Sequence, residues 1–582
     1  MAGRVCVVLL GLAGFLSDAA ATQDPVRVPV REQDRLDPLS TSTHTRFFSE
    51  SEALRGPAGV RTGPLVLTKN GPLRGVTLDL AHVFYGVPYA DPPVGAYRWR
   101  PPRPARPWRG VYDAGAPRAS CMQGCGGPLA DHCPTKVSED CLYLNIFTPL
   151  GVNFSAPLLR PLPVLVWIHG GDFIAGSASK PLYDGRFISN ATDTLVVSLG
   201  YRLGAFGFLV SGKTSKMSAA GNYGILDQQA ALLWIQRNVA AFSGDPGQVT
   251  VFGESAGAQS VALHLTLPSS QPLFRRAALQ SLPFSIPFKS RHDALRLGKA
   301  FSREANCSVS DIVCLLALSP QAVLAAQMKT SSKVVNPFRF LEVFETWGPF
   351  LDGQLITEQT LTAFLRGHWQ TDKSLLLGTT AEEGVIFVNG VFTKPVSAVE
   401  CTVYTTAIFK QHALKVLHKY LPLYQDSDRR GMLAQIVTDY IFLCPARRAA
   451  RAAPESRVWM YVFDHVASDP RVWSGVTSCY RHVCHGAELP FLFHSASVAN
   501  FTMTTGETLL SDRMLCYWGA FARAGDPSPA PRLQTPFCRA ARAPAWPRYD
   551  ARRLLMNLTT PSHAHAGSRD AICDFWDRLG VY

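Results

Sequence analysis

The sequence predicts an α/β fold, because apolar strand-like runs lead directly into glycine-containing turns and helices. Residues 249–252 form one such run, residues 253–257 read Gly-Glu-Ser-Ala-Gly, and residues 256–267 have helical composition. A second continuous apolar run, at residues 163–168, continues into His-Gly-Gly-Asp-Phe at residues 169–173. Both turns carry residues that a catalytic site can use.

The serine in the first turn is predicted to be a nucleophile. On a sharp strand-to-helix turn, the residues two before and two after the serine must be nearly free of side chain, and here Gly253 and Gly257 occupy those positions. Ser255 would then project from the top of the sheet. The N–H group of Ala256 would lie at a helix N-terminus, where it stabilises negative charge. A pentapeptide of this form also arises by chance, so the neighbouring sequence must show whether this one is a nucleophile elbow.

The second turn supplies that context. A glycine-rich loop after an early strand provides the other oxyanion N–H donors of an α/β-hydrolase, whereas residues 169–173 taken alone could be an ordinary glycine turn. Together the two turns indicate the α/β-hydrolase fold, with a large mixed central sheet flanked by helices. No Gly/Ser or Pro linker interrupts residues 63–577, so we expect one catalytic domain there, with helical insertions that form a cap.

A series of ordered motifs makes a family resemblance specific. On these motifs the chain resembles the type-B carboxylesterase/lipase family, also called cholinesterase-like, in its secreted carboxylesterase branch, from about residue 63 to about residue 577. The motifs are Phe-Tyr-Gly-Val-Pro-Tyr-Ala at 84–90, Ser-Glu-Asp-Cys-Leu-Tyr-Leu-Asn at 138–145, Gly-Asn-Tyr-Gly-Ile-Leu-Asp-Gln-Gln at 221–229, Phe-Ser-Gly-Asp-Pro at 242–246, Gly-Ala-Glu-Leu-Pro at 486–490 and Cys-Asp-Phe-Trp at 573–576.

The resemblance implies a catalytic triad of Ser255, Glu383 and His485. Glu383 follows an apolar strand in an acidic-Glu-Gly loop, with the adjacent Glu382 as the competing acid. His485 is singled out by its motif alone, and His482 and His494 are the alternatives. The order serine, acid, histidine is that of α/β-hydrolases. The histidine would take the serine proton, the glutamate would orient the imidazole, and an acyl-enzyme would form and be hydrolysed.

The oxyanion of that reaction would be held by backbone N–H groups of Gly171, Asp172 and Ala256. Relatives often have glycine where Asp172 stands. A carboxylate near a developing oxyanion costs rate unless it points away or is paired. The resemblance also implies that Arg98 and Glu139 form a structural ion pair, and that Glu254 is a buried glutamate that shapes the site.

Both ends of the chain lie outside the predicted catalytic domain. Arg4, an apolar run at residues 5–16 and three alanines at 19–21 predict a signal peptide, residues 1–21. Residues 22–62 are rich in Arg, Ser, Thr and Pro, and we expect a mobile leader, with a propeptide as the alternative. Residues 578–582 would be a short C-terminal tail, without a retrieval or lipid-anchor signal. The chain is therefore expected to be secreted.

Cysteine usage fits the secretory pathway. Fourteen cysteines include Cys6 in the predicted signal peptide, which leaves an odd number, thirteen, too many for a reducing compartment without a metal. The resemblance implies the disulfides Cys121–Cys141, Cys307–Cys314 and Cys444–Cys573. Local spacing suggests Cys125 with Cys133 and Cys479 with Cys484, and leaves Cys401, Cys516 and Cys538 unassigned.

We expect no metal or cofactor. A zinc site of Cys125, Cys133 and His132 is disfavoured, because no four-ligand spacing is present. N-glycosylation is the modification that the sequence predicts. Its five N-x-S/T sequons are at Asn153, Asn190, Asn306, Asn500 and Asn557.

A formal net charge of +13 raises the question of nucleic-acid binding. The excess is arginine scattered through loops, and no aromatic RNA-binding signature accompanies it. A solvated basic face is the simpler interpretation, and weak attachment to anionic glycans or lipid surfaces is the alternative. The arginines that cluster are Arg539, Arg542, Arg548, Arg552 and Arg553.

The sequence predicts carboxylic esters as the substrate class and does not identify the particular ester. In cholinesterases the loop that corresponds to residues 121–141 carries a tryptophan that grips choline by cation–π attraction, and this chain has no tryptophan there. Acetylcholine is therefore disfavoured, while acyl length and oligomeric state stay open. The competing function is a catalytically silent adhesion or binding module of the same fold. Silent relatives typically lose a triad residue, whereas this chain keeps all three.

Overall fold

The computed structural model describes residues 63–124, 133–156, 159–212, 218–331, 345–453 and 457–582. The predicted signal peptide and leader, residues 1–62, lie outside the described residues.

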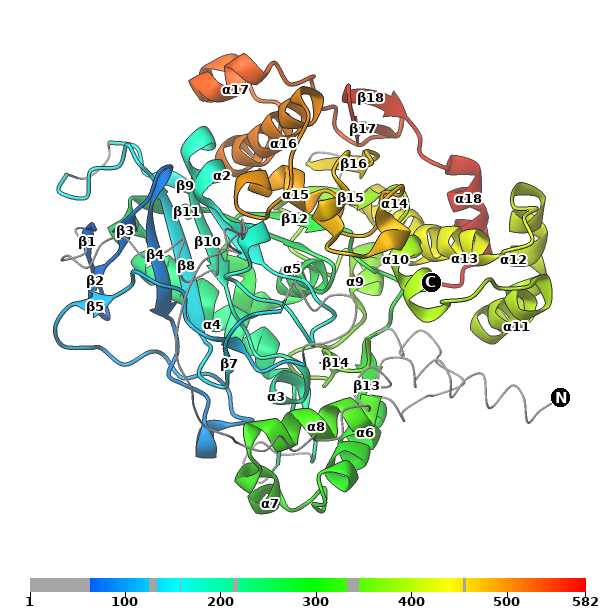
Figure 1. The fold of residues 1–582 in the computed structure, drawn as a ribbon, viewed down its shortest axis with the longest axis horizontal. Coiled ribbons are helices and arrows are strands. Elements are labelled where there is room, and N and C mark those ends of the chain that lie inside the picture. Colours follow the sequence, from blue (N-terminus) through cyan, green and yellow to red (C-terminus); the bar gives the residue numbers. More distant parts are fainter. Residues whose placement is uncertain (1–62, 125–132, 157–158, 213–217, 332–344, 454–456) are drawn as a thin grey trace, which may run out of the picture.

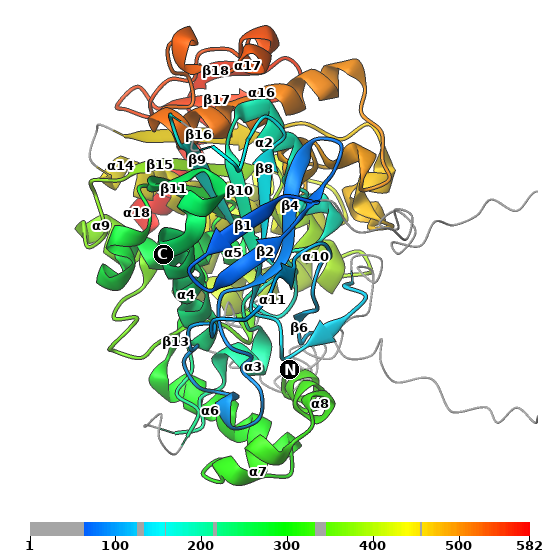
Figure 2. The same ribbon diagram turned by 90° about the vertical axis from the view of Figure 1, so that its left-hand side faces the viewer.

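An eleven-stranded mixed sheet runs through the molecule (Figures 1 and 2). Its order is β18-β17-β16-β15-β12-β11-β9-β10-β8-β4-β3, in which the strands from β17 to β10 are parallel and those at both edges antiparallel. The predicted large mixed sheet is confirmed. The strands are β3 Val76–Thr77, β4 Ala81–Pro88, β8 Tyr143–Pro149, β9 Leu162–Ile168, β10 Leu195–Leu199, β11 Gly244–Glu254, β12 Arg276–Gln280, β15 Ser374–Thr380, β16 Val458–Phe463, β17 Leu554–Leu558 and β18 His563–Ala566.

Helices cover both faces of this sheet, because its central strands are apolar on both sides. In β9, Val164, Val166 and Ile168 join one buried cluster, while Leu165 and Trp167 join a second one. Alternate residues of a strand face opposite sides of a sheet, so the two clusters are the cores of the two faces. The first face is covered by α4 (Tyr223–Asn238) and α5 (Ala256–Thr266), and the second by α2 (Arg186–Thr192) and α16 (Thr505–Ala524).

A group of helices is inserted between β12 and β15. The helices α6 (Arg291–Glu304), α7 (Ile312–Ala317) and α8 (Pro320–Ser331) lie below the sheet in Figures 1 and 2. They share a small core of their own, in which Phe301, Leu315 and Val323 are fully buried. The short strands β13 (Lys289–Ser290) and β14 (Phe350–Leu351) pair in parallel at the two ends of this insertion.

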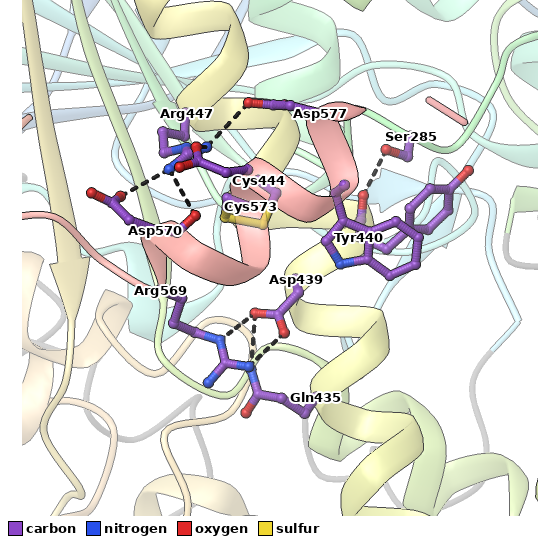
Figure 3. The surroundings of a disulfide bond; sticks show 12 residues. Ser285, Gln435, Asp439, Tyr440, Cys444, Arg447, Arg569, Asp570, Cys573 and Asp577 are labelled. Carbon is purple, nitrogen blue, oxygen red and sulfur yellow. Dashed lines mark hydrogen bonds and ion pairs between the residues drawn. A yellow bond between two sulfur atoms is a disulfide. The ribbon is translucent and has the colours of Figure 1, made fainter. Parts of the chain in front are cut away.

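The C-terminal helix α18 (Asp570–Leu579) is fixed to the body by the Cys444–Cys573 disulfide (Figure 3). Cys444 begins α14 (Cys444–Ala452), and Arg569 just before α18 pairs with the buried Asp439 at 2.6 Å. Tyr582, in the predicted tail, stacks on Tyr440 with ring centroids 5.9 Å apart. Arg447 of α14 binds the carboxylates of α18, which are Asp570, Asp574 and Asp577.

The described residues hold five disulfides in full. Two cysteines that the sequence left unassigned, Cys516 and Cys538, join α16 to α17 (Pro536–Ala541), and Cys401 is a buried free thiol. Cys133 is also disulfide-bonded, and its suggested partner Cys125 lies outside the described residues, as does His132. The remaining four disulfides are Cys121–Cys141, Cys307–Cys314, Cys444–Cys573 and Cys479–Cys484, all of which the sequence suggested.

Candidate active site

Ser255 lies on a sharp turn between β11 and α5, with φ 58° and ψ −124°. This backbone conformation is strained for a residue with a side chain, and such strain gathers at functional sites. Both flanking glycines are required by close contacts. A Cβ on Gly257 would lie 2.1 Å from the carbonyl oxygen of Ile168, and one on Gly253 would lie 2.7 Å from Gly257 itself. The pentapeptide therefore has the geometry of a nucleophile elbow.

The loop at residues 169–173 lies beside the serine. A Cβ on Gly170 would be 3.1 Å from the Cβ of Ser255, so the two turns meet at one edge of the sheet. Gly171 and Asp172 both have positive φ, 110° and 56°. Their N–H groups donate no backbone hydrogen bond within the described part of the chain, and the N–H of Ala256 is one of the free donors of the first helical turn. All three are available to an oxyanion.

His485 is held by a buried glutamate. Its Nδ1–H donates to Glu383 Oε2 at 2.5 Å, and the other oxygen of Glu383 accepts from the backbone N–H of Thr380 at 2.7 Å. The competing acid, Glu382, instead pairs with His482 at 2.9 Å. The structure thus places Glu383, and not its neighbour, next to the imidazole.

The third histidine, His494, lies elsewhere. Its Nδ1 is 2.8 Å from the hydroxyl of Ser511, and its ring stacks on Phe187 with centroids 3.7 Å apart. Burial lowers the pKa of His494 to about 4, which favours a neutral imidazole. It has the properties of a packed, partly buried histidine with a structural role.

The other ring nitrogen of His485 faces Glu254. The distance from Nε2 to Glu254 Oε1 is 3.0 Å, which is an ion-pair distance, although the two groups are not aligned for a hydrogen bond. Burial alone would lower the pKa of His485, but the charges of Glu254 and Glu383 outweigh it and hold this pKa well above its usual range. The imidazole thus lies between two glutamate side chains that both favour its protonated form.

Sequence reasoning did not predict this contact. The sequence predicts Glu254 only as a buried glutamate that shapes the site. The one sequence signal for a contact with His485 is the position of Glu254 next to Ser255. The sequence also assigns no role to Glu488, three residues after His485. Burial, with the charges of Glu254 and Glu383, raises the pKa of Glu488 to about 8, while Gln280 donates to it at 3.2 Å.

Aromatic rings close the site around His485. Phe387 of α10 (Gly384–Val391) and Phe442 lie with ring centroids 5.0 and 5.1 Å from the imidazole. Phe442 belongs to a π-helical segment, Thr438–Leu443, and such segments are frequent at functional sites. Apolar rings exclude water and strengthen every charge interaction at the histidine.

The side chain of Asp172 is the unusual feature of the oxyanion loop. Burial, together with the charge of Glu345, raises the pKa of Asp172 well above its usual range, although Lys289 and His485 act in the opposite direction. The carboxyl group therefore keeps its proton at pH values where an exposed aspartate is charged. A neutral acid at this position would avoid the charge repulsion that the sequence predicts for an oxyanion bound here.

Within the described residues, no three His, Cys, Asp or Glu side chains are grouped as a metal site would need. None of the helices in that part of the chain combines the length and the apolar character that a bilayer crossing requires.

Comparison with known proteins agrees with this geometry. The model of the carboxylesterase family matches residues 62–576. The chain belongs to the carboxylesterase family. The matched range is within a residue of the expected 63–577 at either end, and membership confirms both the resemblance and the α/β-hydrolase fold. It also implies small-molecule esters as the class of substrate.

Three curated relatives illustrate the breadth of the family. Acetylcholinesterase of Bungarus fasciatus is 35% identical over 559 residues, which cover 89% of this chain and 87% of the relative. The crystal protein of Dictyostelium discoideum is 35% identical, over 83% of this chain and 86% of the relative. The cAMP-regulated D2 protein of the same organism is 33% identical, over 80% and 84%.

Proposed function

We propose that this carboxylesterase-family chain is a secreted serine esterase that hydrolyses carboxylic esters through an acyl-enzyme on Ser255. One observation carries the proposal. The strained serine elbow lies beside three free N–H donors, in the same site as a histidine that is oriented by a buried glutamate.

The residues divide the chemistry as follows. Neutral His485 takes the Ser255 proton on Nε2 as the hydroxyl oxygen attacks the ester carbonyl. The three N–H groups hold the oxyanion, each worth about 3 kcal/mol in similar sites. His485 then protonates the leaving alcohol. Water repeats the sequence on the acyl-enzyme, and Glu383 holds the imidazole throughout.

The described structure supports the secretory assignment in part. Several disulfides suit an oxidising compartment. Asn557 differs from the other predicted glycosylation sites, because it lies on β17 between two paired strands and its side-chain oxygen is buried. We propose glycans at the four sequons with exposed asparagines, Asn153, Asn190, Asn306 and Asn500.

Weak attachment to anionic glycans or lipid surfaces stays a proposal for the arginine cluster. Arg552 and Arg553 pair with aspartates, at 2.7 and 3.0 Å, so their charge is partly neutralised. Arg539, Arg542 and Arg548 are exposed as well, and they are the members of the cluster that would contact a polyanion.

A fluorophosphonate probe tests the esterase directly. The wild-type protein should be labelled covalently and should hydrolyse p-nitrophenyl butanoate. Ser255→Ala should lose both properties and keep its fold, because alanine fits the elbow. Ser269→Ala, at an exposed serine beyond α5, is the matched control and should behave as the wild type. Absence of labelling in folded wild-type protein would favour the silent binding module.

A further inference from the structure

His485 lies in an irregular loop, and a disulfide closes the chain directly before it. Residues 480–488 belong to no helix or strand, so regular secondary structure does not fix the histidine. The disulfide joins Cys479 to Cys484, the residue immediately before His485, and holds their Cα atoms 5.7 Å apart. Both cysteines are fully buried. The bridge therefore constrains the main chain at the point where the imidazole leaves it.

The far end of the bridge is anchored beside the element that follows the acid. Cys479 ends a short 3₁₀ helix, Thr477–Cys479, which packs against α10 (Figure 1). Glu383 is the residue directly before α10, and its carboxylate accepts the hydrogen bond from His485. The disulfide thus gives a short covalent path from the neighbour of the histidine to a segment that is packed on the helix of the acid.

Hydrogen bonds join the same two loops nearer to the surface. The N–H of Glu382 donates to the carbonyl of Val483 at 3.2 Å, and the N–H of Val483 donates to the carboxylate of Glu382 at 2.9 Å. The same carboxylate lies 2.9 Å from Nδ1 of His482. About a third of the Glu382 side chain and almost half of the His482 side chain are exposed, at 35% and 45%. Solvent competes for such contacts, whereas the buried disulfide is shielded from it.

We propose that the Cys479–Cys484 disulfide is a positioning element for the base, which keeps Nδ1 of His485 on the carboxylate of Glu383. This inference rests on the proposed esterase function and identifies what holds the base of that same site in place. The distance between Nδ1 and Oε2 is 2.5 Å, and a displacement of about 1 Å would lengthen it beyond a good hydrogen bond. Without the bridge, the loop samples positions in which the imidazole has left the acid, so only a fraction of the molecules is competent.

A second short disulfide of the chain provides a matched control. Cys307 and Cys314 are separated by 7 residues, against 5 for Cys479 and Cys484, and they link α7 to the turn after α6 in the inserted helices. Loops of such similar length restrict the unfolded chain nearly equally, so loop entropy predicts similar losses of stability when either bridge is removed. A difference in activity between the two variants then reports the place of the bridge in the fold.

The test removes each bridge by a double alanine substitution and measures hydrolysis of p-nitrophenyl butanoate. For Cys479→Ala/Cys484→Ala we expect kcat to fall at least tenfold with KM changed less than threefold, because the base acts in the chemical steps and not in substrate binding. Cys307→Ala/Cys314→Ala should keep the wild-type kcat. A folded Cys479→Ala/Cys484→Ala variant with wild-type kcat would overturn the inference, and so would an equal loss of kcat in both variants.

Two measurements show whether the loop has moved, and neither depends on catalysis. Hydrogen–deuterium exchange at residues 480–487 should be faster without the Cys479–Cys484 bridge, because the N–H groups of Val483 and Ala487 are hydrogen-bonded in the closed loop. The downfield proton resonance of the bond between His485 and Glu383 should broaden or disappear. Wild-type exchange and an unchanged resonance in this variant would overturn the positioning role.

Glu382→Ala separates the disulfide from the hydrogen bonds beside it. With the bridge intact, this variant should lose less than threefold in kcat and keep the downfield resonance. A tenfold loss would assign the positioning to Glu382 and overturn the role of the bridge, even if the variant without the disulfide fails to fold.

The same measurements separate this inference from the esterase proposal. Wild-type protein that reacts with a fluorophosphonate, together with a disulfide-free variant that reacts equally fast, would overturn the positioning role and leave the esterase standing. Wild-type protein that is not labelled, but whose His485 resonance depends on the bridge, would remove the esterase and keep the disulfide as the element that holds His485 on Glu383.

Discussion

The two disulfides Cys444–Cys573 and Cys307–Cys314 should differ strongly in their contribution to stability. Their sequence separations are 129 and 7 residues. In the chain-entropy model, cross-linking stabilises by restricting the unfolded chain, by about 5 kcal/mol for the longer loop and about 2.4 kcal/mol for the shorter one at 25 °C. The expected difference is about 2.5 kcal/mol. Two disulfides inside the longer loop, Cys479–Cys484 and Cys516–Cys538, shorten it and reduce the difference by only about 0.2 kcal/mol.

The folded state should change little when the longer disulfide is removed. Arg447 still binds the three aspartates of α18, and Arg569 still binds Asp439 (Figure 3). Helix α18 therefore stays docked in the variant, and the loss arises mainly in the unfolded state. The variants are the double alanine substitutions of each pair, so that no odd thiol is created.

Urea unfolding followed by tryptophan fluorescence measures the effect. The free energy of unfolding should fall at least 1.5 kcal/mol further for Cys444→Ala/Cys573→Ala than for Cys307→Ala/Cys314→Ala. Lower secretion of the first variant is the expected consequence in cells. An equal loss for both pairs, or a larger loss for the short loop, would refute the loop-entropy argument.

Four further predictions concern the site. Ser255→Ala should lower ester hydrolysis by at least about three orders of magnitude, measured as kcat/KM, because no other nucleophile occupies the elbow. Glu254→Gln should shift the acidic limb of the kcat/KM profile to lower pH, since one of the two carboxylates that raise the pKa of His485 is lost. The melting temperature of Asp172→Asn should fall less than that of the wild type as the pH rises from 5 to 8. The pKa of Asp172 in the folded state lies above the unfolded value of about 3.9, so ionisation of this group makes the wild type less stable as the pH rises. Butyrylthiocholine should have no advantage over an uncharged butyrate thioester of similar size, because the 121–141 loop carries no tryptophan.

Each of these predictions has a contradicting result. Full activity of Ser255→Ala would remove the nucleophile assignment, and an unchanged acidic limb in Glu254→Gln would show that Glu254 does not act on the base. A wild-type protein that gains stability from pH 5 to pH 8 relative to Asp172→Asn would reverse the sign argued for its carboxyl group. A tenfold preference for the choline ester would mean that another residue supplies a cation site.

Much of the candidate site could be predicted because its geometry is encoded locally. The elbow depends on Gly253 and Gly257, whose missing side chains make room for the carbonyl of Ile168, and this requirement is visible as a short motif. The choice of Glu383 over Glu382 and of His485 over His482 also followed from motifs that the family resemblance identifies. The strands beside these turns were recognisable as continuous apolar runs, since their residues are buried on both faces of the sheet.

The sequence by itself determined the family and the elbow motif, and it predicted the oxyanion loop, the triad and four of the cysteine pairs that the structure contains. Only the tertiary structure decided which charged side chains act on these residues. Glu254 faces His485 across 231 positions of the chain, and Lys289 and Glu345 approach Asp172 from segments more than a hundred residues away. The Cys516–Cys538 pair likewise depends on how α17 docks on α16. Such contacts leave no periodicity or spacing in the chain, because they are set by the packing of separate elements. The charges that act on His485 and Asp172 are therefore set by that packing.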